Sequence, residues 1–305
     1  MNRLVIALAA ALVVAGAVAL EITATGYVIY LVNLLLVTMV LSLGLHIVIG
    51  ESGQFSLAHA AFYGIGIYTT AMATGAGWPF ALALLAGGAA AAVVGMVIGL
   101  LALRMRDIYL ALSTFAFGEA MQWVFLNWES VTGGPNGYNI RPMHVFGLEI
   151  ISDRMAFPLV AGLAVLFLGV TLVIHHSGFG RALRAVRESE IAASAVGINV
   201  RAMKLAAFTV SAMLAGAAGG MFTTFSTFIH PDSLGFSATI LVLTVVVVGG
   251  IGSVWGVVGG AIVFGLLNEL LRQMPQYQEM IYGAILMGFM MFAPHGLFAA
   301  LRRSR

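Results

Sequence analysis

The chain has 305 residues, of which 61% are hydrophobic and only 9% are charged, and its formal net charge is +2. A soluble domain carries charge on about a quarter of its residues, so this composition excludes a water-covered globular protein and predicts an integral membrane protein. The apolar runs are continuous rather than alternating, which excludes a β-barrel and predicts an all-α, polytopic transmembrane helix bundle. The absence of cysteine excludes disulfides and thiolate metal sites, and no basic pattern suggests nucleic acid.

Apolar runs long enough to cross a bilayer, about 17–25 residues, divide the chain into about ten predicted spans. The first run also fits a signal peptide, but without a convincing cleavage site we expect it to remain as an uncleaved helix. The region 236–271 fits two spans or a broken, re-entrant pair, since only the sequence GGIGS interrupts it. We place the spans at residues 4–20, 27–49, 57–74, 79–103, 108–127, 156–175, 204–228, 236–251, 254–271 and 279–294.

The basic residues predict the orientation of the bundle, because cytoplasmic loops are enriched in Lys and Arg. With ten spans, most of them lie on one side of the membrane, and we therefore expect both termini in the cytoplasm. The residues on that side are Arg3, Arg104, Arg106, Arg302, Arg303, Arg305 and those of the segment 178–204.

The segment 178–204, GFGRALRAVRESEIAASAVGINVRAMK, is the one long polar stretch between two hydrophobic halves. It carries seven of the 26 charged residues, which are 14 basic and 12 acidic. Its apolar residues Leu183, Val186 and Ile191 have roughly helical spacing. This pattern predicts a short amphipathic helix on the cytoplasmic surface that contacts another protein. A solvated loop at anionic lipid headgroups is the alternative.

Two breaks in the apolar pattern are candidates for a solute path. Residues 50–56, GESGQFS, interrupt the apolar stretch 27–74, and non-helical backbone at membrane depth often lines such a path. An ordinary cytoplasmic turn capped by Ser52 or Ser56 is the alternative. On the outer side, the long loop 129–155 contains TGGPNGYNIRP, whose glycines and proline leave backbone amides free to face a ligand.

Few ionisable residues lie within the predicted spans. Glu119 is in the middle of the span 108–127, close to Thr114, and a carboxylate there should face the bundle interior. His46 and His59 flank the break at 50–56, and Glu269 lies near the outer end of its span. The alternative for each is a structural role as a bridge between helices. No series of carboxylates resembles a proton relay, which disfavours an ion-coupled carrier.

Nothing in the sequence predicts an enzyme. A Walker A motif needs a lysine after a glycine, and the only lysine, Lys204, follows Met203. HExxH and GxSxG motifs are also absent, and His175 and His176 are expected to be interfacial rather than metal ligands. We therefore predict no catalytic residue, no metal and no cofactor bound by this chain.

Several motifs resemble those of bacterial ATP-binding cassette (ABC) importer permeases. Residues 188–193 followed by Gly197 are similar to the cytoplasmic signature written EAA, three residues, G. The wider segments resemble branched-chain amino acid permeases of the LivM type, over about residues 30–300. These segments are GQFSLAHAAFYGIGIYTTA at 53–71, RDIYLALSTFAFGEAMQWVFLNW at 106–128, TGGPNGY at 132–138, VVVVGGIGSVWGVVGGAIVFGLLNELLR at 245–272 and PHGLF at 294–298.

The resemblance implies one permease domain, 1–305, in the bacterial inner membrane, with 178–204 as its cytoplasmic coupling loop. It implies a second homologous permease subunit, two cytoplasmic ATPases that bind ATP, an extracytoplasmic solute-binding protein and lipid as partners. The apolar residues of the loop would then enter a groove on the ATPase, and Gly197 would end its helix. The expected coupling residues are Arg184, Arg187, Glu188, Glu190, Ala192, Ala193 and Gly197, and the expected solute-path residues are Gln54, Ser56, His59, Thr114, Glu119, Gly134 and Asn136.

The sequence departs from the family pattern in the break, where SLGH or SLGQ reads Ser56-Leu57-Ala58-His59. Because of this departure, two classes of solute remain as alternatives. One is hydrophobic amino acids, and the other is the urea, amides or other small polar solutes of related permeases. A secondary carrier and a passive channel are the remaining alternatives.

Overall fold

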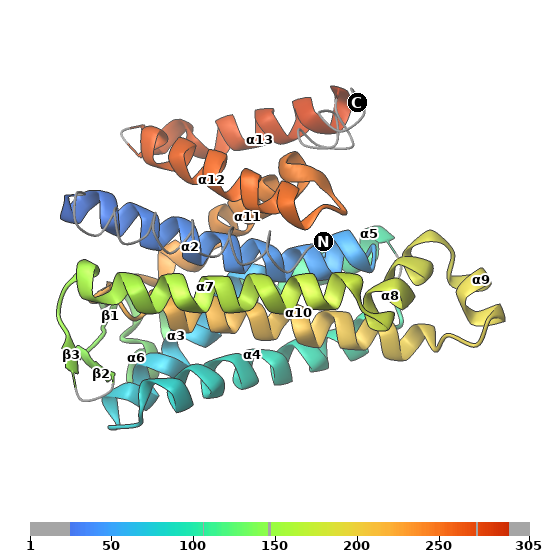
Figure 1. The fold of residues 1–305 in the computed structure, drawn as a ribbon. Helices are drawn as coiled ribbons and strands as arrows, with labels where there is room; N and C mark the ends of the chain where they lie inside the picture. Colours follow the sequence, from blue (N-terminus) through green and yellow to red (C-terminus); the bar gives the residue numbers. More distant parts are fainter. Residues whose placement is uncertain (1–24, 106, 146–147, 273, 293–305) are drawn as a thin grey trace, which may run out of the picture.

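The computed structural model describes residues 25–105, 107–145, 148–272 and 274–292. Long helices lie side by side along a common axis, and the short helices α8 and α9 project from one end (Figure 1). This arrangement confirms the predicted all-α bundle. Its helices are α2 (Gly26–His46), α3 (His59–Gly75), α4 (Phe80–Ala102), α5 (Asp107–Asn127), α7 (Asp153–His176), α8 (Gly178–Glu188), α9 (Glu190–Ala195), α10 (Val200–Phe222), α11 (Phe236–Gly250), α12 (Val254–Leu271) and α13 (Pro275–Phe292).

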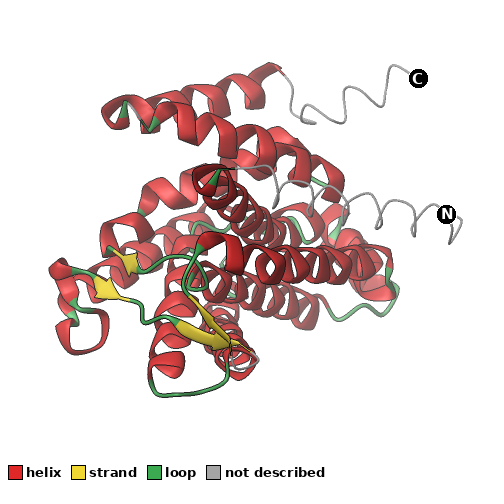
Figure 2. Cartoon of the chain, turned by 60° about the vertical axis from the view of Figure 1, so that its left-hand side comes forward, coloured by secondary structure: helices red, strands yellow, loops and turns green. Residues whose placement is uncertain are grey.

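The opposite end of the bundle is built from short elements (Figure 2). The helix α6 (Glu129–Thr132) and the 3-10 turn η2 (Gly134–Asn136) lead into β1 (Tyr138–Asn139), which pairs antiparallel with β4 (Phe228–Ile229). A second antiparallel pair joins β2 (Met143–Val145) to β3 (Leu148–Ile150). The turn-rich loop 129–155 is thus folded against the chain that follows α10, and a 3-10 turn, η3 (Pro231–Leu234), leads from there into α11.

Helix α10 is central and packs against α2, α3 and α4. Small residues allow the backbones to approach closely, as in other membrane bundles. A Cβ atom added to Gly66 of α3 would overlap the backbone of Gly216 in α10, and one added to Gly87 of α4 would overlap Thr70 of α3. The glycines of this chain therefore set the spacing between its central helices.

The break at 50–56 lies inside the protein and is not a surface turn. Helix α2 continues into one π-helical turn, η1 (Ile47–Glu51), and the chain then runs without helix to His59. Ser56 and His59 are fully buried, and the backbone N–H of Leu57 donates to Thr114 Oγ1 at 3.0 Å. Thr114 is two turns into α5. Because Leu57 bonds to it just before α3 begins, the start of α3 lies within the bundle. The segment is therefore non-helical and mostly buried, while its depth in the membrane stays a prediction.

Residues 236–271 form two helices that lie side by side. Helices α11 and α12 pack against each other, and a Cβ atom on Gly260 of α12 would meet the backbone of Gly249 in α11 at 3.1 Å. Gly250 and Gly252, at the turn between them, have φ values of 124° and 101°, which side chains disfavour. The short GGIGS sequence suffices as a turn because two of its glycines adopt these angles.

Six helical segments among the described residues are long and apolar enough to cross a membrane: 26–51, 80–102, 153–176, 200–222, 231–250 and 254–271. Helices α3, α5 and α13 run beside them but are not among the six. The first predicted span, 4–20, lies outside the described residues, as does the PHGLF motif. Several boundaries also move, since α10 begins at Val200 and includes Arg201 and Lys204, which the polar segment was expected to contain.

Candidate functional site

The segment 178–204 is called the coupling segment below, after the role expected for it. Its first half is a helix that packs on the bundle. Helix α8 begins with Ser177, whose hydroxyl accepts a hydrogen bond from the backbone N–H of Gly180 at 3.1 Å. Its apolar face buries Leu183 completely and Val186 almost completely. Leu183 belongs to a hydrophobic cluster with Ile47 of η1 and Leu214 of α10. Leu183 and Val186 are therefore core residues, and the expectation that they enter a groove on another protein is wrong.

Polar contacts fix the same helix to η1. Glu51, 1% exposed, accepts from Arg184 Nη1 at 2.6 Å through Oε2 and lies 2.5 Å from His175 Nδ1 through Oε1. The guanidinium of Arg187 donates to the carbonyl oxygen of Gly50. A carboxylate out of water needs such charged partners, since an unpaired one is costly. The carboxyl end of η1, the end of α7 and α8 therefore form one connected unit.

The second half of the segment, α9, is a separate short helix. Ser189 has extended backbone angles, ends α8 and caps α9 by accepting from Ala192 N at 3.2 Å. The helix ends at Gly197, with φ of 85°, where Ile198 N donates to Ala193 O and Gly197 N donates to Ser194 O. This is the Schellman pattern of hydrogen bonds. The expected end at Gly197 agrees with this geometry, but the expected single helix is two.

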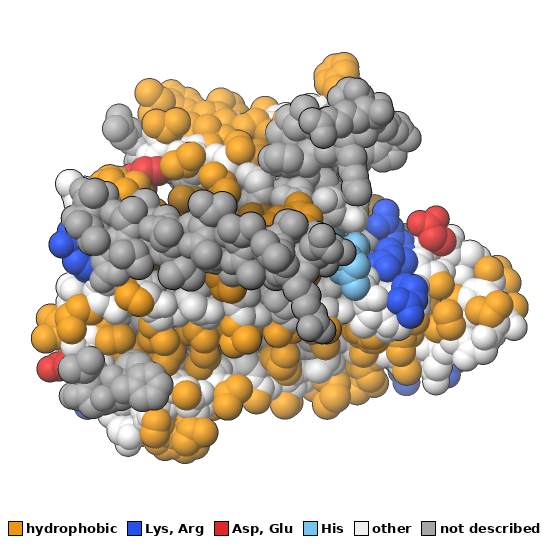
Figure 3. Space-filling view, viewed as in Figure 1, with side chains coloured by type: hydrophobic (Ala, Val, Ile, Leu, Met, Phe, Trp, Pro, Cys, Tyr) orange, Lys and Arg blue, Asp and Glu red, His pale blue; other side chains and the backbone are white. Residues whose placement is uncertain are grey.

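The apolar side chains of the second half of the segment are exposed, whereas those of α8 are buried. Ile191 is 83% exposed and Val196 is 77% exposed, and Ala192 is also at the surface, whereas Ala193 is buried against the chain. Lys and Arg side chains gather on the α8 end of the molecule, next to hydrophobic surface on α9 (Figure 3). The free apolar residues of the coupling segment are thus Ile191 and Val196.

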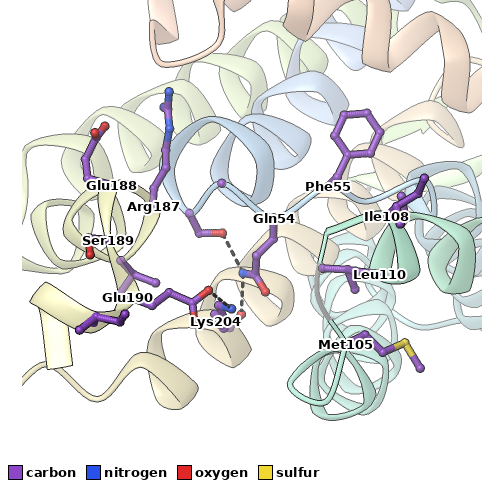
Figure 4. A pocket seen from close by; sticks show the side chains of 15 residues that line it. Gln54, Phe55, Met105, Ile108, Leu110, Arg187, Glu188, Ser189, Glu190 and Lys204 are labelled. Atoms are coloured by element: carbon purple, nitrogen blue, oxygen red, sulfur yellow. Dashed lines mark hydrogen bonds and ion pairs between the residues drawn. The ribbon is translucent and has the colours of Figure 1, made fainter.

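A cavity of about 690 Å³ separates the coupling segment from the start of α5. Figure 4 shows Gln54 at its centre, donating to Ser52 Oγ at 2.8 Å and to the carbonyl oxygen of Lys204 at 3.3 Å. The ammonium of Lys204 also pairs with Glu190 Oε1 at 2.5 Å. Glu188 and Glu190, expected in coupling, and Gln54, expected in the solute path, therefore line the same cavity.

Deeper in the bundle, the helix starts of α3 and α11 meet beside α5. The backbone N–H of Ala60 donates to Thr239 Oγ1 at 3.4 Å, and His59 Nε2 lies 3.1 Å from Ser211 Oγ. Leu57, Gly118, Glu119 and Thr239 line a small cavity at this place. His59 thus contacts α10 through Nε2, and Thr114 Oγ1 accepts from the backbone of Leu57 while it donates to backbone carbonyls of its own helix.

We expected Glu119 to face the interior of the bundle, but in the structure it does not. It is exposed, on a face of α5 that also exposes Leu112 and Trp123. A carboxylate halfway along a membrane helix is costly against lipid. The described part of this chain does not cover this face of α5.

The last two predicted solute-path residues are at the other end of the molecule. Gly134, buried, and Asn136, exposed, belong to η2, beyond the carboxyl end of α5. Gln54, Ser56, Thr114, Glu119 and η2 thus follow α5 from one end of the bundle to the other, and they do not share one cavity.

Sequence reasoning missed Glu51, Thr239 and Ser211. Glu51 joins three elements. Its signal in the sequence was a carboxylate at the end of an apolar run, on the same side of the membrane as the basic segment 178–204 in the predicted orientation. Thr239 and Ser211 are small hydroxyl residues within apolar spans, and no sequence signal distinguishes them from others of their kind.

Residues 27–293 match the family described as the branched-chain amino acid transport system / permease component. The chain is 35% identical to the high-affinity branched-chain amino acid transport system permease protein LivM of Escherichia coli K12, over 88% of this chain and 69% of LivM. The corresponding LivM of Salmonella typhimurium is 34% identical, with the same coverage. The high-affinity branched-chain amino acid transport system permease protein LivH of E. coli K12 is 28% identical, over 84% of this chain and 89% of LivH.

No solved structure matches the chain. The match to the family covers most residues of this chain. It includes the coupling segment and the residues that line the two cavities described above. The chain belongs to the family of branched-chain amino acid transport permeases.

Proposed function

We propose that this chain is one of two permease subunits of an ABC importer for branched-chain amino acids in a bacterial inner membrane. The observation that carries the proposal is the seating of α8 on η1. The helix that would receive force from an ATPase is bonded to Gly50 and Glu51, directly before the non-helical segment that leads into the bundle. A movement of α8 is thus transmitted to the start of α3.

In this proposal α9 and the exposed edge of α8 are the docking surface for a cytoplasmic ATPase. Ile191 and Val196 supply exposed apolar contacts, and Glu188 lies beside them at the surface. Helix-in-groove binding uses such apolar anchors with a polar rim. The ATPase binds ATP, since the sequence of this chain lacks a P-loop.

The second permease subunit lies against the exposed face of α5. This position shields Glu119 from lipid and places it, with the cavity beside Leu57 and Thr239, at the boundary between two subunits. The similarity of this chain to both LivM and LivH supports a pair of homologous permeases. Branched-chain amino acids then pass along α5 between the subunits.

The cytoplasmic side is the end that carries α8 and α9, and the solute-binding protein docks at the opposite end, on the loops 129–152 and 223–235. We infer ten spans with both termini in the cytoplasm. The clustering of Lys and Arg at the α8 end supports this orientation (Figure 3).

Reconstitution of the chain in proteoliposomes tests the proposal. We expect leucine uptake only when the second permease, the ATPases, ATP and the binding protein are all present. Leucine uptake by this chain alone, or uptake driven by an ion gradient without ATP, would show a secondary carrier or a channel instead. Urea and short amides are the competing solutes in the same assay.

A further inference from the structure

We propose that His46, Glu51 and His175 form a binding site for a divalent transition metal ion such as Zn²⁺, and that the bound ion restrains the coupling helix. The restraint rests on the proposed function, whereas the binding does not. The three residues come from α2, from η1 and from the end of α7, directly beside α8. One ligand atom of each lies within 4.8 Å of the others.

The separation of Glu51 and His46 fits a zinc site of two histidines and one carboxylate. Bonds of about 2.0–2.2 Å in a tetrahedral site place ligand atoms about 3.3–3.5 Å apart. Glu51 Oε1 is already 3.3 Å from His46 Nε2, while it is 2.5 Å from His175 Nδ1. The imidazole of His175 must therefore move by about 0.8 Å to 1 Å. Its side chain is 26% exposed and has solvent on one side, so the movement is feasible.

The state of His46 points independently to a ligand. The residue is completely buried, Nδ1 has no hydrogen-bond partner among the described residues, and Nε2 has only the 3.3 Å ion-pair contact with Glu51 Oε1. Buried polar atoms are nearly always hydrogen-bonded, and one without a partner destabilises the fold. A metal on Nε2 would satisfy that nitrogen and use the imidazole in its neutral form.

Arg184 defines which metals the site accepts. Its guanidinium bonds to Glu51 Oε2 at 2.6 Å and to the carbonyl oxygen of His175 at 3.0 Å, so Oε1 remains available. It also lies 3.3 Å from His175 Nδ1, so the movement of the imidazole that the ion requires must turn this nitrogen away from Arg184. The positive charge opposes a cation that is held by charge alone. Mg²⁺ and Ca²⁺ depend on several oxygen ligands, whereas Zn²⁺, Co²⁺ and Ni²⁺ bond well to imidazole. We therefore expect binding of the second group and not of the first.

A bound ion would tie the inner end of α2 to the end of α7. Arg184 connects the shared carboxylate to α8, as an outer partner that orients a metal ligand. In the proposed function η1 passes the movement of α8 to the start of α3, so an ion that ties η1 to the ends of α2 and α7 would slow transport.

The binding test uses the full importer complex, freed of any polyhistidine tag and treated with a chelator. Co²⁺ is titrated while its visible absorption is recorded, and Zn²⁺ is then added as competitor. We expect saturable, stoichiometric Co²⁺ binding that Zn²⁺ reverses and excess Mg²⁺ does not. His175→Ala should abolish the absorption, and Glu51→Gln should weaken binding at least tenfold.

His176→Ala is the matched control, because the neighbouring histidine is bonded to the carbonyl oxygen of Leu172 and is not part of the cluster. Equal binding by His175→Ala and His176→Ala, or no saturable binding by the wild type, would overturn the site.

Transport is measured separately, as leucine uptake with and without Zn²⁺. We expect Zn²⁺ to slow wild-type uptake several-fold and to leave His175→Ala unaffected. Zn²⁺ binding without any effect on uptake would overturn the restraint. Absence of leucine uptake under all conditions would instead contradict the proposed function, because the Co²⁺ titration does not depend on transport.

Discussion

Helices α8 and α9 follow one another in the chain, and each begins with a serine cap, but they are attached to the molecule in different ways. Helix α8 buries Leu183 and Val186 and is bonded to η1 through Arg184 and Arg187. Helix α9 exposes Ile191. The difference divides the coupling segment into a part that holds the membrane helices and a part that is free to contact a partner.

The same difference explains why hydrophobicity alone is a poor guide to a docking surface. Leu183 and Ile191 are both apolar and both fit one amphipathic helix in the sequence. The extended backbone of Ser189 breaks that helix, and the two residues then face different surroundings. Each of the following substitutions tests this division.

The largest effect is expected from truncating the buried residue. Leu183→Ala should lower the free energy of unfolding by about 2–5 kcal/mol, because it leaves a cavity among packed side chains. Ile191→Ala, the control in α9, should change it by less than about 0.5 kcal/mol, as for other surface positions. Unfolding of the purified complex in denaturant measures both, and equal losses would contradict the division.

Removal of the carboxylate at the centre of the polar contacts should come next. Loss of one partner of a fully buried ion pair costs about 3–5 kcal/mol. The side chain of Arg184 is 34% exposed, so we expect about 2 kcal/mol for Glu51→Ala, measured in chelator. The control is Glu190→Ala, whose pair with Lys204 involves an exposed carboxylate and should be worth about 0–1 kcal/mol. A Glu51 variant as stable as the control would remove Glu51 from the anchoring of α8.

The exposed residue of α9 should matter for binding and not for folding. Ile191→Asp should weaken capture of the ATPase about tenfold, which corresponds to about 1.4 kcal/mol. Ile151→Asp is the control, because Ile151 is 74% exposed but lies at the opposite end of the molecule. Binding of the purified ATPase to immobilised permease separates the two variants. Unchanged capture by Ile191→Asp would show that docking uses another surface.

The smallest effect concerns the end of α9. Gly197→Ala places a side chain at φ of 85°, which costs about 1 kcal/mol. Hydrogen exchange should accordingly become faster for the amides of Gly197 and Ile198. Gly178→Ala at the start of α8 adds a methyl group in ordinary contact with the end of the Arg181 side chain, at 3.9 Å, and should leave exchange unchanged. Unaltered exchange in Gly197→Ala would mean that α9 ends by other contacts.

Much of this protein follows from its sequence alone. Length, composition and uninterrupted apolar runs determine an α-helical membrane bundle, because lipid offers no partner for open backbone groups. The polar segment 178–204, the break at 50–56 and the family motifs each depend on a short stretch of sequence, and the sequence alone located them. The helix end at Gly197 was predicted because a left-handed angle at a helix end favours glycine.

Other features depend on which segments meet in space. The side chain of Glu51 becomes significant only because α7 and α8 return to η1, more than 120 residues later in the chain. The burial of Leu183, the exposure of Glu119 and the start of α3 inside the bundle likewise depend on neighbours. Helical periodicity places residues on a common face, but only tertiary packing decides whether that face meets the core, a partner or solvent.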